Sequence, residues 1–319
     1  MRLTLITTAI LGATTLTATA ATLSGSTGYG LRNNGMELTI FEDLGMASQG
    51  TNVTLSDRLN AIAYRPVTRE LYGYQVGTGG AADQVFIIDP MTGMLTNTGA
   101  TSPEGAKLSQ GSRVGFDFNN AIDAARAVST SDENVVFFPS SFGDDRANSI
   151  LQFTDLAYAE GDENFGSNPR IFANAYTNAI DGTTASETLQ FALDANSNSL
   201  VTLANNAGTL NTIAPITLSG QMFDFNQNGG FEILSDSEGD NLAIALLTER
   251  DTDNTGLYTI DLATGAASFF GEDLRGQYRG FAAMTNSTVA AVPLPAGIPL
   301  ILTGLGAFGA IRAARRKKA

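Results

Sequence analysis

The chain of 319 residues contains no histidine, no cysteine and no tryptophan. Without histidine there is no Ser-His-Asp triad and no histidine metal site; without cysteine there is no thiol nucleophile, zinc thiolate cluster or disulfide. A sugar-binding platform built on tryptophan is excluded as well. The fold must therefore be stabilised by its hydrophobic core, for which a chain of this length is sufficient.

Basic residues are also scarce, with 18 lysines and arginines against 32 acidic residues. Six of the 18 lie in terminal segments that we expect to be removed, namely Arg2, Arg312, Arg315, Arg316, Lys317 and Lys318. The remaining body has 12 basic and 32 acidic residues, a net charge of −20, and Lys107 is its only lysine. Such a surface repels the phosphates of nucleic acids, so we expect no nucleic-acid partner.

The first twenty residues have the layout of a secretory signal peptide. Arg2 is followed by an uncharged run that ends in Ala18-Thr19-Ala20, a small-residue cleavage site. We therefore expect export, with cleavage after Ala20.

The last thirty residues form a tail of three parts. An extended proline segment comes first, because each proline fixes φ and restricts the residue before it; its residues are Val292, Pro293, Leu294, Pro295 and Ala296. Residues 298–311 are apolar and would span roughly 20 Å as a helix, against about 30 Å of bilayer hydrocarbon. The basic end is expected on the cytoplasmic side; its residues are Arg312, Arg315, Arg316, Lys317 and Lys318. An ordinary tail anchor is the alternative.

This order of motif, apolar segment and basic end resembles the VPLPA variant of the PEP-CTERM sorting signals. The resemblance covers only the tail and implies recognition by an exosortase-type membrane protease. It also implies a transient stay in the inner membrane, cleavage near the motif, and a final place at the cell surface or outside the cell. We therefore divide the chain into a signal peptide (1–20), a body (21–286) and a sorting signal (287–319).

The body has the pattern of an all-β protein, with short apolar runs separated by Gly, Ser, Thr and Asn. A run related to Gly115-Phe116-Asp117-Phe118-Asn119 recurs about every fifty residues, the length of a four-stranded propeller blade. We expect first strands near Ala61, Gly115, Asn174, Met222 and Gly280, and hence five blades. The ring would close by pairing of residues 280–284 with strands from residues 24–57. A β-sandwich or an open β-solenoid is the alternative.

A second motif predicts a strand followed by a tight turn. Residues 85–88 and 257–260 are apolar runs, and each is followed by Asp-x-x-Thr-Gly, from Asp89 to Gly93 and from Asp261 to Gly265. The Asp side chain can hydrogen-bond the backbone two residues on, and Gly accepts a positive φ. With both motifs, the body from about Glu37 to Met284 resembles a family of secreted bacterial domains of unknown function. That resemblance implies no activity.

Asp117 and Asp224 each lie between two phenylalanines in these repeats. Alternation on a strand would point both carboxylates away from the core, towards solvent, a neighbouring blade or a central channel. Two carboxylates around a channel are what glycoside hydrolysis requires. Capping of backbone N–H groups is the commoner use of such an Asp, so we expect no catalytic residue, with a carbohydrate-active hydrolase using Asp117 and Asp224 as the alternative.

Calcium is the one cofactor that the sequence suggests. Asp224, Asn226 and Asn228 open a run that resembles a calcium loop, but Ser235 stands where the loop needs a glutamate. Asn- and Asp-rich turns often look like this without binding a metal. The function that we predict is a non-enzymatic binding or structural role in the cell envelope or extracellular matrix, with polysaccharide or envelope proteins as partners.

Overall fold

The computed structural model describes residues 22–47, 50–252 and 254–285, in a compact unit that ends at Thr285. The signal peptide and the sorting signal predicted from the sequence lie outside these residues. In the described part, helix is limited to two short 3-10 turns, η1 (Leu44–Met46) and η2 (Asn205–Ala207). No helix of that part is long and apolar enough to cross a membrane. The predicted all-β class is confirmed.

The strands form five sheets, and each is named here by its first strand. The β4 sheet contains β4 (Ala61–Arg65), β5 (Glu70–Gln75), β6 (Gln84–Ile88) and β7 (Leu95–Asn97). The β8 sheet contains β8 (Val114–Asn119), β9 (Ala124–Ser129), β10 (Asn134–Phe138) and β11 (Ser149–Gln152). The β13 sheet contains β13 (Ile171–Tyr176), β14 (Gln190–Asp194), β15 (Ser199–Ala204), β16 (Thr209–Pro215) and β12 (Ala157–Tyr158).

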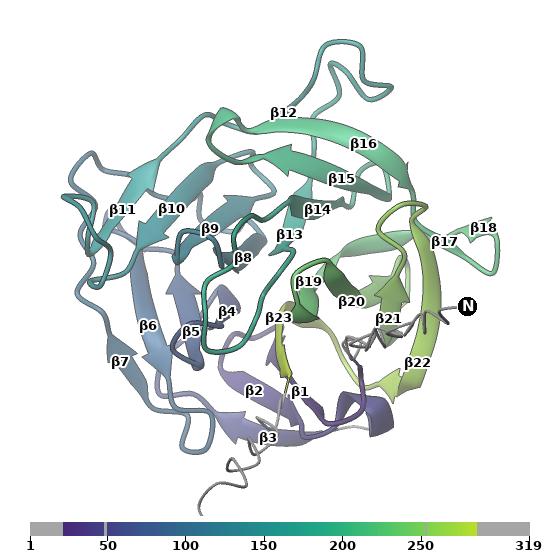
Figure 1. Ribbon diagram of the computed structural model, residues 1–319, viewed down its shortest axis with the longest axis horizontal. Coiled ribbons are helices and arrows are strands. Elements are labelled where there is room, and N and C mark those ends of the chain that lie inside the picture. The colour runs from purple at the N-terminus through teal and green to yellow at the C-terminus, as the bar shows by residue number, and fades with distance from the viewer. Residues whose placement is uncertain (1–21, 48–49, 253, 286–319) are drawn as a thin grey trace, which may run out of the picture. The chain divides into compact units, whose positions relative to one another are not determined.

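The β19 sheet contains β19 (Phe225–Ser237), β20 (Asp240–Glu249), β21 (Thr255–Ile260), β22 (Ala266–Leu274), β17 (Thr217–Leu218) and β18 (Gln221–Met222). The β23 sheet contains β23 (Tyr278–Thr285), β1 (Ser26–Arg32), β2 (Glu37–Phe41) and β3 (Thr51–Thr54). The first strands contact one another in the circular order β4, β8, β13, β19, β23 and back to β4. Figure 1 shows these inner strands around a common centre. The arrangement is propeller-like, as predicted.

The ring closes through the two ends of the body. β23 pairs with β1 in antiparallel register, with Tyr29 opposite Ala282 and Ser26 opposite Thr285. One sheet thus takes its inner strand from the C-terminal end of the body and its outer strands from the N-terminal end (Figure 1). This pairing confirms the predicted closure, which leaves neither partner as an unpaired inner edge.

Two details of the prediction are wrong. The sheets do not all have four strands. β12 pairs in parallel with β16, and β17 pairs in parallel with β22, so two of the sheets are extended. Met222 is not in an inner strand: it lies in β18, at the outer edge of its sheet, and is 63% exposed. The inner strand of that sheet is β19, where Gly230-Phe231-Glu232 occupies the position of Gly115-Phe116-Asp117 in β8.

Glycine at this position lets the inner strands approach closely. A Cβ atom on Gly230 would lie 2.3 Å from the backbone nitrogen of Phe281, and one on Gly115 would lie 2.7 Å from Cα of Ala173. The next residues, which include Phe116, Phe231 and Phe281, line a central cavity of only about 10 Å³. Contact between inner strands therefore selects the Gly-Phe pairs, and it fills the middle of the ring.

The two Asp-x-x-Thr-Gly stretches form the predicted strand and turn. Asp89 Oδ1 accepts from the backbone nitrogen of Met91 at 2.9 Å, and Asp261 Oδ1 accepts from that of Ala263 at 2.9 Å. Gly93 and Gly265 follow with φ of 74° and 69°. A Cβ atom at position 93 would also lie 1.9 Å from the carbonyl oxygen of Thr54. Both the positive φ and this close contact therefore require glycine there.

The two ends of the ring differ. At one end, where the inner strands finish, residues 177–189 between β13 and β14 reach across to other sheets (Figure 1). Gly182 donates its backbone N–H to Pro66 at 2.9 Å, and Ala185 donates to Asn120 at 3.1 Å. At the other end, residues at or near the starts of β4, β8 and β23 line a pocket.

Candidate functional site

The structure does not bring Asp117 and Asp224 together. Asp117 lies in β8, is 3% exposed, and accepts from the backbone nitrogen of Tyr176 in β13 at 2.7 Å. Asp224 precedes β19, its side chain is 58% exposed, and it forms an ion pair with Arg250 at 2.5 Å. The expectation that the two carboxylates occupy equivalent positions is therefore wrong.

Glu232, which the sequence reading did not single out, is the true counterpart of Asp117. It is 3% exposed, and its carboxylate accepts from the backbone nitrogens of Ile233 at 2.9 Å and Ala283 at 3.3 Å. Asp117 thus joins β8 to β13, and Glu232 joins β19 to β23. Burial raises the pKa of Glu232 to about 8, and burial, followed by the nearby Glu232, raises the pKa of Asp117 well above its usual range. Both groups serve as links between inner strands.

The suggested calcium ligands face separate partners. Asp224 is paired with Arg250, Asn226 Oδ1 accepts from the backbone nitrogen of Asn228, and Asn228 Oδ1 accepts from Arg113. The run lies at an irregularity in the pairing of β19 with β20, not in a loop that wraps an ion. Among the described residues, no group of three or more acidic side chains is placed to hold a metal ion. These three residues therefore do not fit a calcium site.

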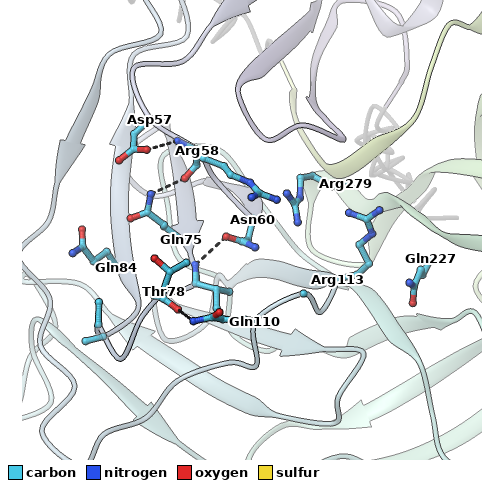
Figure 2. A pocket seen from close by; sticks show the side chains of 15 residues that line it. Asp57, Arg58, Asn60, Gln75, Thr78, Gln84, Gln110, Arg113, Gln227 and Arg279 are labelled. Atoms are coloured by element: carbon cyan, nitrogen blue, oxygen red, sulfur yellow. Dashed lines mark hydrogen bonds between the residues drawn. The ribbon is translucent and has the colours of Figure 1, made fainter.

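The pocket at the open end of the ring has a volume of about 650 Å³. Figure 2 shows its side chains, which are mainly amides and guanidinium groups. They come from the segments before β4 and β8, from the start of β23, from the β5–β6 hairpin and from the bulge of β19. The polar ones are Asp57, Arg58, Asn60, Gln75, Thr78, Gln84, Gln110, Arg113, Gln227 and Arg279. We call this hollow the arginine pocket.

Three arginines converge there from three different segments (Figure 2). Arg279 is only 4% exposed, and its Nε has no hydrogen-bond partner. Burial and the neighbouring Arg113 and Arg58 lower its pKa to about 10. Burial and Arg58 also lower the pKa of Arg113. Both Arg279 and Arg113 stay cationic at neutral pH, although neighbouring positive charge contributes to lowering the pKa of each.

No carboxylate of the described residues forms an ion pair with any of these three arginines, although four other arginines are paired. Arg113 donates to the side-chain oxygen of Asn228, and Arg279 donates to the backbone carbonyl of Asn33 at 3.5 Å. Asp57 accepts from the backbone nitrogen of Arg58 at 2.6 Å and points away from the guanidinium groups (Figure 2). The pocket is therefore a positive site in an acidic protein, suited to an anion.

The sequence reading missed this pocket. Arg113 and Arg279 stand two and one residues ahead of Gly115 and Gly280, and Arg58 stands three ahead of Ala61. A basic residue near the start of three inner strands could indicate such a pocket. The pattern can be recognised only once the register of the strands is known. The sorting motif and basic end, by contrast, lie outside the described residues.

Comparisons with known proteins identify a family for most of the body. The family model described as a domain of unknown function (DUF4394) matches residues 42–282. No curated protein matches this chain.

Solved structures give only distant similarities. A chain of a nidogen/laminin complex is 11% identical, with a TM-score of 0.43, over 81% of this chain and 98% of that chain. A protein of unknown function from Bacteroides thetaiotaomicron is 11% identical, with a TM-score of 0.47, over 81% of this chain and 59% of that one. An auxiliary nutrient binding protein from the same organism is 14% identical, with a TM-score of 0.38, over 68% and 55%. Scores this low support no conclusion about what this chain binds.

Proposed function

We propose that this chain, which belongs to the DUF4394 family of domains of unknown function, is an exported binding protein of the cell envelope or extracellular matrix. Its body would be a five-bladed propeller that presents the arginine pocket to a ligand. The signal peptide would direct export, and an exosortase-type protease would process the tail near Val292-Pro293-Leu294-Pro295-Ala296, with release to the cell surface or beyond.

The arginine pocket is the main observation that supports a binding role. Its volume of about 650 Å³ lies within the range of small-molecule sites, which is about 300–1,000 Å³. Its polar groups come from several segments and converge on one hollow, as expected for ligand orientation. Among the described residues that line it, Asp57 is the one carboxylate, so no acid and base pair faces the hollow. This favours binding over hydrolysis.

A ligand screen tests the binding role. The purified full chain is melted with neutral oligosaccharides, uronate-bearing oligosaccharides and small organic acids. A ligand at one hundred times its dissociation constant stabilises the folded state by about 2.7 kcal/mol, so a bound class raises the melting temperature in a concentration-dependent way.

Arg279→Gln should abolish that rise, because it removes the buried cation of the pocket. Arg170→Gln, which changes an exposed arginine away from the pocket, is the matched control and should keep it. A rise that survives Arg279→Gln, or no rise with any class, contradicts the proposed role.

A further inference from the structure

We propose that the arginine pocket takes a ligand with at least two negative charges on oxygen atoms, as in a polycarboxylate or a phosphorylated compound. This inference rests on the binding role proposed above and specifies its ligand class. We further infer that Asn228 is a positioning residue, which holds Arg113 in place without neutralising it.

The positive charge of the pocket indicates how many negative charges the ligand should carry. Three guanidinium groups face the hollow, and the one lining carboxylate, that of Asp57, is turned away from them (Figure 2). Burial, followed by repulsion from the neighbouring arginines, lowers the pKa of Arg279 and of Arg113. A ligand with one charge would leave most of this repulsion in place. A ligand with two or three charges would relieve it.

The neutral partners in the pocket contrast with the arginines elsewhere. Four other arginines have an Asp as partner, in the pairs Arg65–Asp123, Arg69–Asp181, Arg146–Asp144 and Arg250–Asp224. In the pocket, an amide oxygen and a backbone carbonyl take the place of that carboxylate. Because acidic residues outnumber basic ones in this body, neutral partners here leave positive charge for a ligand.

Hydrogen bonds fix the orientation of Asn228. Its Nδ2 donates to Oε1 of Gln277 at 3.1 Å, and the same oxygen accepts from Nδ2 of Asn33 at 3.1 Å. With its nitrogen engaged there, Asn228 turns its oxygen towards Arg113. The amides of Asn228, Gln277 and Asn33 are thus linked by hydrogen bonds, and this group holds Arg113 in its orientation.

Arg279 supplies the donor that a ligand would complete. Its side chain is nearly buried at the edge of the hollow, and Nε has no partner. A buried donor without an acceptor is unfavourable, and an ionised oxygen is the strongest acceptor for a guanidinium group. A ligand oxygen at this atom would satisfy the donor and neutralise the charge together.

Isothermal titration of the full chain tests the inference with pyrophosphate and citrate as the two sources of multiple charge. Acetate and a neutral disaccharide are titrated at matched ionic strength, since salt screens such contacts. We expect pyrophosphate, citrate or both to bind at least tenfold more tightly than acetate. Whichever of the two anions binds more tightly identifies phosphate or carboxylate as the preferred group.

Asn228→Asp has nearly the same shape and adds one negative charge beside Arg113. It should lower the affinity for the bound anion about tenfold, because it converts the neutral partner into an ion-pair partner. Asn211→Asp, the same change at an exposed position of β16, is the control and should change affinity less than twofold. Arg113→Gln should reproduce the loss, so the inference stays testable if Asn228→Asp melts early.

The outcomes separate this inference from the binding role. Anion binding that Asn228→Asp and Arg113→Gln leave unchanged overturns the inference. If the disaccharide binds and Arg279→Gln abolishes that binding, while neither anion binds, the inference fails and the binding role stands.

Discussion

Asp117 and Glu232 show how two buried acids can serve structure. Each carboxylate is nearly inaccessible, and each accepts a backbone N–H from the neighbouring inner strand. Burial without a cationic partner raises the pKa of both. The energetic consequence is a dependence of stability on pH that has no connection with ligand binding.

Glu232→Gln should remove part of this pH dependence. Below about pH 4.5 the folded and unfolded states both hold the proton; as the pH rises towards 8, the unfolded state loses it first, so stability falls. The amide of the variant cannot ionise. Melting temperatures are measured from pH 5 to 9 for both proteins. The melting temperature of the variant should therefore increase relative to that of the unchanged protein as the pH rises, up to about pH 8. Parallel curves for the two proteins would show that Glu232 does not titrate in this range.

Gly230→Ala should destabilise the fold by about 3 kcal/mol, because the new methyl group meets the backbone of Phe281 and Gly280, which cannot give way. Gly143→Ala is the matched control, since its Cβ meets nothing within 4 Å. Denaturant titrations compare the two. A similar midpoint for both variants would mean that the inner strands are not in tight contact.

The residues show where sequence reasoning succeeds and where it stops. The turn at Asp89 could be predicted because the hydrogen bonds that Asp89 accepts all come from within five residues. The register of β19 could not, since Phe223-Asp224-Phe225-Asn226 has the same local pattern as the run at Asp117. What selects Gly230 instead is contact with β23, some fifty residues away in the chain. The arginine pocket was missed for the same reason, because Arg58, Arg113 and Arg279 meet only when the ring has closed.

At the scale of elements, β23 joins the two ends of the body. It pairs with β1 along seven residues of that strand and contacts β4 and β19 on either side of the ring. Figure 1 shows it between β4 and β19. Its second residue is Arg279, so closure of the fold and completion of the pocket depend on the same strand.

Removal of β23 should therefore cost several kcal/mol, out of a typical total of about 5–15 kcal/mol for a domain. A chain that ends after Gly276 lacks the whole strand, and one that ends after Ala290 lacks only the tail. Thermal melting and limited proteolysis compare them. Equal melting temperatures would show that β23 does not close the ring, and would favour an open arrangement of sheets.

At the scale of the whole molecule, charge is distributed unevenly. The body is strongly acidic, yet three of its eleven arginines gather at one end of the ring without carboxylate partners. Of the six basic residues outside the body, five lie at the C-terminus, where we propose a sorting role. We propose that these two groups of positive charge have separate roles, ligand binding in the pocket and sorting at the membrane in the tail.

Pro293→Ala combined with Pro295→Ala should leave the precursor uncleaved in the inner membrane, because the extended segment that a processing enzyme would recognise is lost. Immunoblots of membrane, periplasmic and medium fractions report the size and place of the product. Arg312→Lys, which keeps the charge of the basic end, should be processed normally. Release of a trimmed product from the double variant would refute the sorting proposal.

The central claim is that a multiply charged anion binds among Arg58, Arg113 and Arg279. A crystal structure of the protein with citrate or pyrophosphate, at a concentration near the dissociation constant measured in solution, tests it most directly. We expect the anion in the arginine pocket, with one oxygen within hydrogen-bond distance of Nε of Arg279 and another near Arg113, which still contacts Asn228. An empty pocket, or the anion bound elsewhere on the molecule, would contradict it.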